Sequence, residues 1–478
     1  MSGPAATNVV LVTVDSLRAD ALDNDDGVSP VLDDLADGGV VFENAFAQGN
    51  WTPFSFPSIL GSRPVFAERP DIGLASTPSI AERLSEAGFA TAGFNAANGF
   101  LTDPWGYDRG FDEFEPFVDS GGYSKYLAAH PTVQAWVQLA TSPFRRAATV
   151  LSGGSDDRPF ADISRMGDLE DNAVQFLRET EDGFFLWIHY MDTHTPYVPA
   201  PRHLREVADA RLSVVRMLSS HVRTGLGWDV DERTLETLET LYAATVRQVD
   251  ASVGRIMETL EAEGFADETA VVVAGDHGEE FLEHGHLAHY PKLYRELVDV
   301  PLFVSRPGGP SGTIDAPVGL DSIPPTVCDL LGVAPAEAWE GPSLVGALDG
   351  AAPLADQTPI VSAAVRGESV TSQPIPRRLD DGELLLSARD ERWTYIEHTD
   401  SGHRELYDRD ADPGEQRDLC SEATAERAPT PVLDRLSRAV SEHADRLQAA
   451  SESSAGEEPG DGQASDEITA RLRALGYQ

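Results

Sequence analysis

The sequence predicts an α/β fold with a large, mostly parallel central sheet. Three apolar runs rich in β-branched residues, at positions 9–14, 184–188 and 271–273, indicate strands that are buried on both faces. Apolar side chains recur at helical spacing along residues 235–263, which indicates a long amphipathic helix. Strands that alternate with helices form parallel sheets covered on both sides, so we expect a three-layer α/β/α sandwich.

Shorter elements between these strands are marked by capping chemistry. A hydroxyl side chain followed by proline is typical of a helix start and occurs at Ser29-Pro30, Thr52-Pro53 and Thr77-Pro78. Further strands are expected at residues 89–93 and 300–304, and further helices at residues 169–179 and 326–331. A glycine-rich surface loop is expected at residues 153–159.

The length of 478 residues exceeds what one ordinary hydrophobic core holds, so a large domain and a smaller one are expected. Beyond residue 353, short apolar runs alternate with charged turns and a helical pattern follows, which predicts a small α+β subdomain with antiparallel strands. We therefore expect an α/β domain over residues 1–350 and the subdomain over residues 351–449. An acidic flexible tail with a short terminal helix should follow over residues 450–478.

Acidic residues dominate the composition. The chain has 80 Asp and Glu against 36 Lys and Arg, a formal net charge of -44, and Lys125 and Lys292 are its only lysines. Acid-rich, lysine-poor surfaces are typical of halophile proteins, whose salt-loaded cytoplasm screens the repulsion between carboxylates. The same charge would repel phosphates, so nucleic acid is not expected as a partner. Lacking a signal peptide pattern, a transmembrane run or a disulfide framework, the sequence predicts a cytoplasmic protein.

A turn that carries a carboxylate beside an imidazole follows the strand at residues 271–273. Asp276 and His277 occupy this turn and His284, His286 and His289 follow, so four of the twelve histidines fall within thirteen residues. Ligands of α/β sheets bind beyond the carboxyl ends of the strands, and this group of side chains suits a divalent cation. The alternative is a turn aspartate with solvent-exposed histidines.

Other candidate residues also end strands or begin helices. Asp15 closes the strand at residues 9–14, and His189 and His194 follow the strand at residues 184–188. Thr52 lies at a helix N-terminus, where the macrodipole favours anions, so its hydroxyl is a candidate nucleophile for an anionic ester. The alternatives are local: Asp15 as a turn or capping residue, and Thr52 as a helix cap only.

The order and context of these residues resemble the sulfatase family of the alkaline-phosphatase superfamily. The segment NVVLVTVDSLRAD is similar to the first strand and metal ligand of that family, and HYMDTHTPY is similar to its substrate-contacting histidine loop. The segment AVVVAGDHGE is similar to the second pair of ligands, and ELYDRDADPGEQRDL to the C-terminal subdomain. This colinear resemblance implies an alkaline-phosphatase-like fold and one divalent metal ion, Ca, Mn, Mg or else Zn. The roles it implies are metal binding by Asp15, Thr52, Asp276 and His277, nucleophilic attack by Thr52, catalytic and substrate contacts by His194 and His289, and substrate binding or loop support by Arg18.

Departures from the family pattern concern the nucleophile and the groups that grip sulfate. Typical sulfatases carry Cys-x-Pro-Ser-Arg and convert the cysteine to formylglycine, whereas this chain has Thr52 followed by Pro-Phe-Ser-Phe. A shifted frame that starts at Ser55 restores Ser-x-Pro-Ser but misplaces the residues that follow, so Thr52 is preferred. Ser16 replaces the second aspartate of the usual pair, and residues 95–98 lack the usual lysine and histidine.

These residues predict a metal-dependent hydrolase or transferase that acts on an anionic ester of a small molecule, glycan or lipid. A threonine hydroxyl can attack phosphorus once a metal lowers its pKa, so the chemistry favours a phosphoester or phosphonate. Two alternatives stay open. One is a conventional sulfuric ester hydrolase of a sulfated carbohydrate, and the other is a sulfatase fold that persists as a binding module without catalysis.

The charge predicts that folding depends on salt. Repulsion among the carboxylates is relieved only when the Debye length falls to about 3 Å, near about 1 M salt. The thermal midpoint of unfolding should therefore rise between dilute buffer and about 2 M KCl, as measured by circular dichroism. An unchanged midpoint would contradict this expectation.

Overall fold

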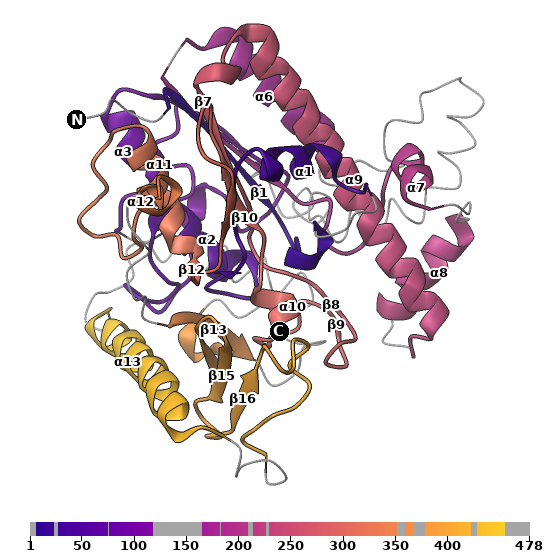
Figure 1. The fold of residues 1–478 in the computed structure, drawn as a ribbon, viewed down its shortest axis with the longest axis vertical. Coiled ribbons are helices and arrows are strands. Elements are labelled where there is room, and N and C mark those ends of the chain that lie inside the picture. The colour runs from indigo at the N-terminus through magenta and orange to yellow at the C-terminus, as the bar shows by residue number, and fades with distance from the viewer. Residues whose placement is uncertain are drawn as a thin grey trace.

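The computed structural model describes residues 6–22, 27–74, 76–117, 165–181, 183–208, 214–225, 229–350, 359–366, 378–421 and 428–454. The loop expected at residues 153–159 and the tail from residue 455 onward lie outside the described residues. A large central sheet lies between two layers of helices, and a smaller sheet with one long helix lies beside it (Figure 1).

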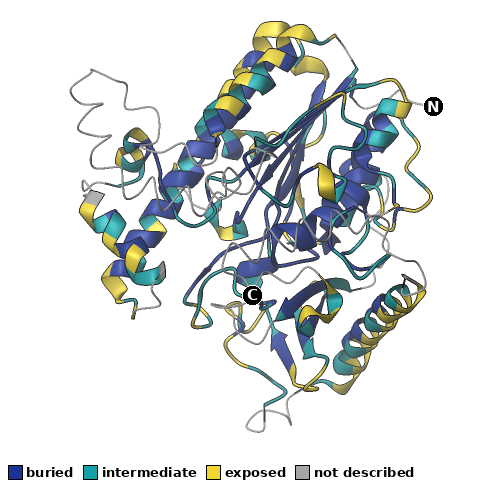
Figure 2. Cartoon of the chain, turned by 180° about the vertical axis from the view of Figure 1, so that it is seen from behind, coloured by how far each residue is buried: buried dark blue, intermediate teal, exposed yellow. Residues whose placement is uncertain are grey.

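Among the described residues, the central sheet has eight strands and is mostly parallel. In spatial order they are β11 (Gly312–Ile314), β2 (Val40–Phe42), β10 (Leu302–Ser305), β7 (Thr269–Gly275), β1 (Asn8–Val14), β6 (Phe184–Tyr190), β4 (Ala90–Asn95) and β5 (Glu113–Glu115). Only β10 runs antiparallel to its neighbours. Strands β1, β6 and β7 are buried along their whole length, which agrees with their unbroken apolar sequences and with Figure 2.

Helices cover both faces of this sheet. Alternate side chains of β1 enter different apolar clusters, Val9 and Leu11 on one face and Val10 and Val12 on the other. The first face is covered by α2 (Thr52–Gly61), α3 (Ile80–Glu86) and α11 (Ile323–Leu330), and the second by α1 (Pro30–Asp37), α6 (Met166–Glu179) and α9 (Glu232–Glu263). The predicted three-layer α/β/α class is therefore confirmed.

The C-terminal part forms an antiparallel sheet of four strands with a helix packed on it. The elements are β13 (Ile360–Arg366), β14 (Glu383–Arg389), β15 (Trp393–His398), β16 (Arg404–Asp408) and α13 (Thr430–Ser454). Their apolar core also includes Trp51 and Phe54, from the start of α2. This sheet therefore packs directly against the helix that begins at Thr52.

The remaining elements are short. They are α7 (Pro201–Val207), α8 (Val214–Gly225), α10 (Arg295–Val298) and α12 (Val345–Leu348), the strand pairs β12 (Val318–Gly319) with β3 (Ala45–Phe46) and β8 (Glu280–Phe281) with β9 (Leu287–Ala288), and 3-10 turns at Ala19–Ala21, Asp103–Trp105, Ala266–Glu268, Leu320–Ser322 and Leu379–Asp381. Within the described ranges, none of the helices has both the length and the apolarity needed to cross a membrane.

Two expected helix starts need correction. The helix predicted to begin at Thr77-Pro78 begins instead at Ile80, because Ser79 accepts the backbone N–H of Glu82 and forms a capping box with it. Thr52 is the first residue of α2 rather than its N-cap, which is Trp51. The domain boundaries at residues 350 and 449 stay predictions, although α13 continues to Ser454.

The N-terminus of α1 is capped from another helix. Oδ1 of Asp250, on α9, accepts the backbone N–H groups of Val31 at 2.8 Å and Leu32 at 2.9 Å. Ser29, the expected cap, instead donates its hydroxyl to Asp33. This contact fastens α1 to α9 on the second face of the sheet.

We expect Asp250→Ala to lower the free energy of unfolding by about 1–3 kcal/mol, because two N–H groups at a helix terminus lose their acceptor. Urea denaturation in high salt measures this change. The matched control is Glu261→Ala, at an exposed position of the same helix, which should change stability by less than about 0.5 kcal/mol. Equal effects of the two variants would argue against the capping role.

Candidate active site

Neighbouring strands of the central sheet bring acidic and imidazole groups to one edge. β1 and β7 are parallel and in register, so Asp15 and Asp276, which directly follow them, emerge side by side. His189 lies near the end of β6, on the other side of β1. One ligand atom from each of Asp15, His189 and Asp276 lies within 4.8 Å of the other two, and all three side chains are buried.

The two carboxylates perturb each other because they are close together and removed from water. Burial raises the pKa of Asp276 well above its usual range, and the negative charge of Asp15 raises it further. Burial also acts to raise the pKa of Asp15, but the surrounding histidines outweigh it and hold that pKa below its usual range. Without a compensating cation, the pair therefore favours one negative charge over two.

His277 presents an unprotonated nitrogen to the same carboxylates. Its Nδ1 lies 2.9 Å from the carbonyl oxygen of Gly278, which can only accept, so Nδ1 carries the proton of the neutral ring. Its Nε2 then lies 3.7 Å from Oδ1 of Asp15 and 3.7 Å from Oδ2 of Asp276. Burial lowers the pKa of His277, which favours the neutral imidazole that binds metals.

Buried polar atoms without a hydrogen-bond partner gather here. In the described part of the chain they include Oδ2 of Asp276 and Nε2 of His189, whose other ring nitrogen lies 3.0 Å from the hydroxyl of Thr13. Buried polar atoms without partners are costly unless something binds them. A divalent cation held by carboxylate oxygens and imidazole nitrogens would satisfy both atoms, so these residues fit the metal ion that the resemblance implies. His189 was absent from the predicted ligand set; its position on the strand next to β1 is the signal that could have found it.

The hydroxyl of Thr52 lies at this centre and that of Ser55 does not. Thr52 Oγ1 donates to Oδ2 of Asp15 at 3.0 Å and lies 3.5 Å from Nε2 of His277. Ser55, one turn later in α2, donates its hydroxyl to the carbonyl oxygen of Gly49 at 3.0 Å. The geometry therefore favours the frame in which Thr52 holds the nucleophile position over the frame that starts at Ser55.

Neutral donors occupy the positions where the sequence departs from the family pattern. Asn98 donates its side-chain amide to Oδ2 of Asp15 at 3.2 Å and is almost fully buried. Ser16 donates its hydroxyl to Oδ1 of Asp15 at 3.0 Å and its backbone N–H to Oδ1 of Asp276 at 3.0 Å. Ser16 has a φ of 57°, a left-handed conformation that these two contacts hold in place.

His194 and His289 lie together beside His277. The ring centroids of His289 and His194 are 5.0 Å apart, and those of His289 and His277 are 4.9 Å apart. His289 Nδ1 lies 3.2 Å from Oε2 of Glu279, a fully buried carboxylate that sequence reasoning missed. Burial acts to raise the pKa of Glu279, but its contact with His289, the charge of His194 and the hydrogen bond from Tyr197 together outweigh burial and lower that pKa.

Arg18 lies in the loop after β1, and its guanidinium binds other loop residues. It pairs with Asp20 at 2.7 Å and with Glu283 at 2.6 Å, and donates to the carbonyl oxygen of Glu279 at 2.8 Å. These contacts favour the interpretation of Arg18 as support for the loop. Its contribution to substrate binding stays a prediction.

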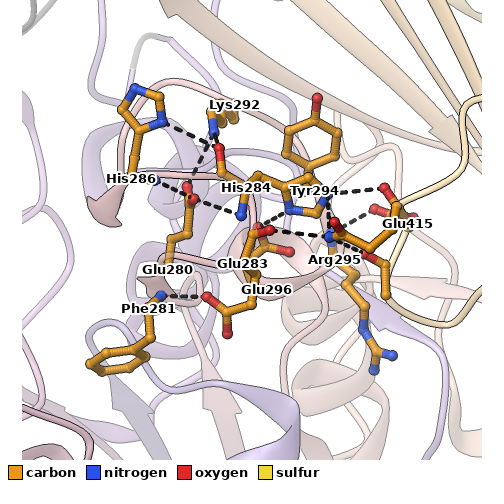
Figure 3. A network of polar contacts seen from close by, with 12 residues as sticks. Glu280, Phe281, Glu283, His284, His286, Lys292, Tyr294, Arg295, Glu296 and Glu415 are labelled. Carbon is orange, nitrogen blue, oxygen red and sulfur yellow. Dashed lines mark hydrogen bonds and ion pairs between the residues drawn. The ribbon is translucent and has the colours of Figure 1, made fainter. Parts of the chain in front are cut away.

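His284 and His286 belong to a second polar network (Figure 3). His284 Nδ1 lies 2.6 Å from Glu296, its Nε2 lies 2.9 Å from the carbonyl oxygen of Glu415, and its ring stacks on Tyr294 at 3.7 Å. Burial acts to lower the pKa of His284, but Glu296 raises it above its ordinary value. His284 therefore joins the β8–β9 segment to the C-terminal part of the chain, whereas His286 contacts the carbonyl oxygen of His284 and the ring of Tyr290.

Comparison with known sequences finds relatives of one family. The family profile described as Sulfatase matches residues 7–333. A delta 4,5-hexuronate-2-O-sulfatase of Bacteroides thetaiotaomicron is 23% identical over 441 residues, which cover 83% of this chain and 80% of that protein. A sulfatase of Formosa agariphila is 26% identical over 257 residues, which cover 50% of this chain and 47% of that protein. The match thus spans less than half the length of the Formosa relative.

Solved structures of similar fold include a phosphonate monoester hydrolase and a protein bound to a sulfated sugar. A phosphonate monoester hydrolase from Silicibacter pomeroyi superposes with a TM-score of 0.68 at 23% identity, covering 92% of this chain and 96% of that one. A protein solved in complex with its substrate D-glucosamine-2-N,6-O-disulfate superposes with a TM-score of 0.67 at 18% identity, covering 93% of this chain and 98% of that one. At these identities the likeness shows the shared fold.

We expect Asp276→Ala and His277→Ala each to remove the bound metal and the activity, because each deletes a ligand from a buried site. His189→Ala should weaken metal binding as well. Inductively coupled plasma mass spectrometry on protein purified in high salt measures metal content. His286→Ala, in the second network, is the control and should retain metal. Stoichiometric metal in Asp276→Ala or His277→Ala would count against the assignment.

Proposed function

The chain belongs to the sulfatase family, and from that premise we propose that it is a metal-dependent hydrolase of anionic esters with Thr52 as the nucleophile. The observation that carries the proposal is the position of Oγ1 of Thr52, 3.0 Å from Asp15 and 3.5 Å from His277 at the start of α2. A hydroxyl that only capped a helix would instead contact the backbone N–H groups of its own first turn.

The first step is attack of Thr52 on the phosphorus or sulfur atom of the ester. As the new bond to Oγ1 forms, the hydroxyl proton passes toward Oδ2 of Asp15, which already accepts its hydrogen bond. A divalent cation held by Asp15, Asp276 and His277 would lower the pKa of the hydroxyl and offset charge on the transferred group. The N-terminus of α2 adds a favourable field for the anion.

The bond from phosphorus or sulfur to the alcohol oxygen breaks in the same step. The electron pair goes to the alcohol oxygen, which takes a proton from an imidazole, either His194 or His289. A water molecule then attacks the threonyl ester, and the imidazole that gave the proton takes one from the water. This second step breaks the bond to Oγ1 and releases the acid anion, and Oγ1 of Thr52 takes back its proton from Asp15.

The charges around Thr52 favour an ester with a single negative charge. Asp15 is contacted by a hydroxyl from Ser16, an amide from Asn98 and an imidazole from His277, all uncharged donors or ligands. Such groups offset a second negative charge on the substrate poorly. We therefore propose phosphodiesters or phosphonate monoesters as substrates in preference to phosphate monoesters.

A sulfated carbohydrate is the second candidate substrate. It is favoured by the delta 4,5-hexuronate-2-O-sulfatase, which is 23% identical in an alignment that covers 83% of this chain. A sulfate monoester also carries one negative charge, so the charge argument admits it. The two candidate substrates differ in whether Thr52 attacks phosphorus or sulfur. A panel of para-nitrophenyl esters in high salt, with sulfate, phosphate, phosphodiester and phosphonate groups, separates them, and no turnover with any metal would support a binding module.

We expect Thr52→Ala to lower kcat by about three orders of magnitude or more, because a covalent nucleophile is rarely replaced. Thr52→Ser should keep substantial activity, since the hydroxyl remains. Steady-state kinetics on the best ester of the panel measures both, and mass spectrometry after rapid quenching should locate the adduct on Thr52.

The matched control is Ser55→Ala, which removes a buried hydroxyl one turn along the same helix. It should cost far less in kcat than Thr52→Ala. An adduct on Ser55, or near-normal turnover by Thr52→Ala, would show that another group is the nucleophile.

A further inference from the structure

Glu279 is a buried carboxylate two residues beyond the metal-ligand pair. Its side chain is fully buried, its Oε1 accepts the hydroxyl of Tyr197 at 2.7 Å, and its Oε2 lies 3.2 Å from Nδ1 of His289. The guanidinium of Arg18 fixes the backbone carbonyl of Glu279 at 2.8 Å. Both carboxylate oxygens and the backbone are thus held in one orientation.

The ring of His289 is fixed by this contact and by its own backbone. The indole Nε1 of Trp51 donates to the carbonyl oxygen of His289 at 2.5 Å, and Trp51 directly precedes Thr52. The Glu279 carboxylate engages Nδ1, so Nε2, on the other side of the ring, is left for the substrate. The backbone of His289 is therefore held close to Thr52, the proposed nucleophile, by the hydrogen bond from Trp51.

His194 has a different partner. Its Nδ1 lies 2.5 Å from the carbonyl oxygen of Thr195, a neutral group of its own loop. A doubly protonated His289 would form an ion pair with Glu279 at 3.2 Å, in direct contact. A doubly protonated His194 would have that carbonyl at Nδ1, and the charges of Glu279 and Asp15 would act on it only without a direct hydrogen bond. In a buried site the carboxylate compensates a positive ring far better than a carbonyl does.

We propose that Glu279 is a positioning residue that makes His289, rather than His194, the proton donor to the departing alcohol. The inference rests on the proposed ester cleavage. When the bond from phosphorus or sulfur to the alcohol oxygen breaks, that oxygen keeps the electron pair and takes the proton from Nε2 of His289. The ring of His289 becomes neutral while its Nδ1–H stays hydrogen-bonded to Glu279. In the second step Nε2 of the same ring takes a proton from the attacking water.

The test compares leaving groups, because an alcohol of low pKa departs without a proton and one of high pKa does not. We expect Glu279→Gln to lower kcat/KM by about 10- to 100-fold for an alkyl leaving group and by less than about threefold for para-nitrophenol. His289→Ala should show the same pattern more strongly. In the His289→Ala background, adding Glu279→Gln should change kcat/KM by less than about twofold, because Glu279 acts through that ring.

Controls separate this role from a structural one. Glu280→Gln alters the adjacent buried carboxylate, which belongs to the second network, and should leave the dependence on leaving group unchanged. His194→Ala should lower kcat/KM to a similar extent for all leaving groups. Metal content should stay stoichiometric in Glu279→Gln.

Three outcomes would overturn the inference. These are an equal loss for all leaving groups in Glu279→Gln, additive effects in the double variant, and a leaving-group dependence that appears in His194→Ala instead. Failure of the proposed nucleophile would appear separately, as turnover by Thr52→Ala. The choice of proton donor is thus tested whichever hydroxyl attacks the ester.

Discussion

Two carboxylates held side by side in the protein interior govern the chemistry of this site. Asp15 and Asp276 follow adjacent parallel strands that are in register, so the backbone leaves them little freedom to separate. Two like charges removed from water are unfavourable unless a positive charge balances them. Thr52 and Asn98 both donate to Oδ2 of Asp15, and Ser16 donates to Oδ1 of Asp15 and to Oδ1 of Asp276. Oδ2 of Asp276, however, keeps no hydrogen-bond partner. A divalent cation held by Asp15, Asp276 and His277 would balance this charge and would lower the pKa of the Thr52 hydroxyl.

The residues before α2 link Thr52 to two other parts of the molecule. Asn50 donates its amide to the carbonyl oxygen of Tyr290 at 3.2 Å, beside the bond from Trp51 to His289. Trp51 and Phe54 also lie in the core of the C-terminal sheet. The C-terminal sheet therefore packs against the first turn of α2, while the residues just before that turn hold the segment that follows β9. Motion of either part would move the hydroxyl relative to the proton donor.

Local sequence patterns were sufficient to predict the buried strands and the site residues that directly follow them. The strands at residues 9–14, 184–188 and 271–273 were recognisable because burial on both faces requires unbroken apolar runs. Asp15 and Asp276 followed from those strands, since parallel strands end at the same edge. The apolar runs beyond residue 353 did not indicate β16, because Arg404–Asp408 is mostly polar. This segment is a strand only through its pairing with β15.

Contacts between distant segments could not be predicted in this way. Glu279 looks like any acidic turn residue until Tyr197 and His289 are brought to it from other parts of the chain. His284 and His286 share the segment of His289, yet their partners are Glu296, Glu415 and the chain of their own loop. Spacing along the chain gives the residue types near a site, whereas side-chain direction depends on tertiary packing.

In the proposed mechanism, a threonine nucleophile in place of a formylglycine changes which step the protein must assist. The hydrate of an aldehyde carries a second hydroxyl, and its collapse can expel the bound acid group. A threonyl ester has a single oxygen and must be opened by water, so the site needs a base on the face from which the alcohol departed. His289 lies between His194 and His277 with its Nδ1 held by Glu279, and once it has given its proton it is the neutral base required. The buried Glu279 therefore matters in both halves of the reaction, because the same ring must lose a proton and regain it without turning.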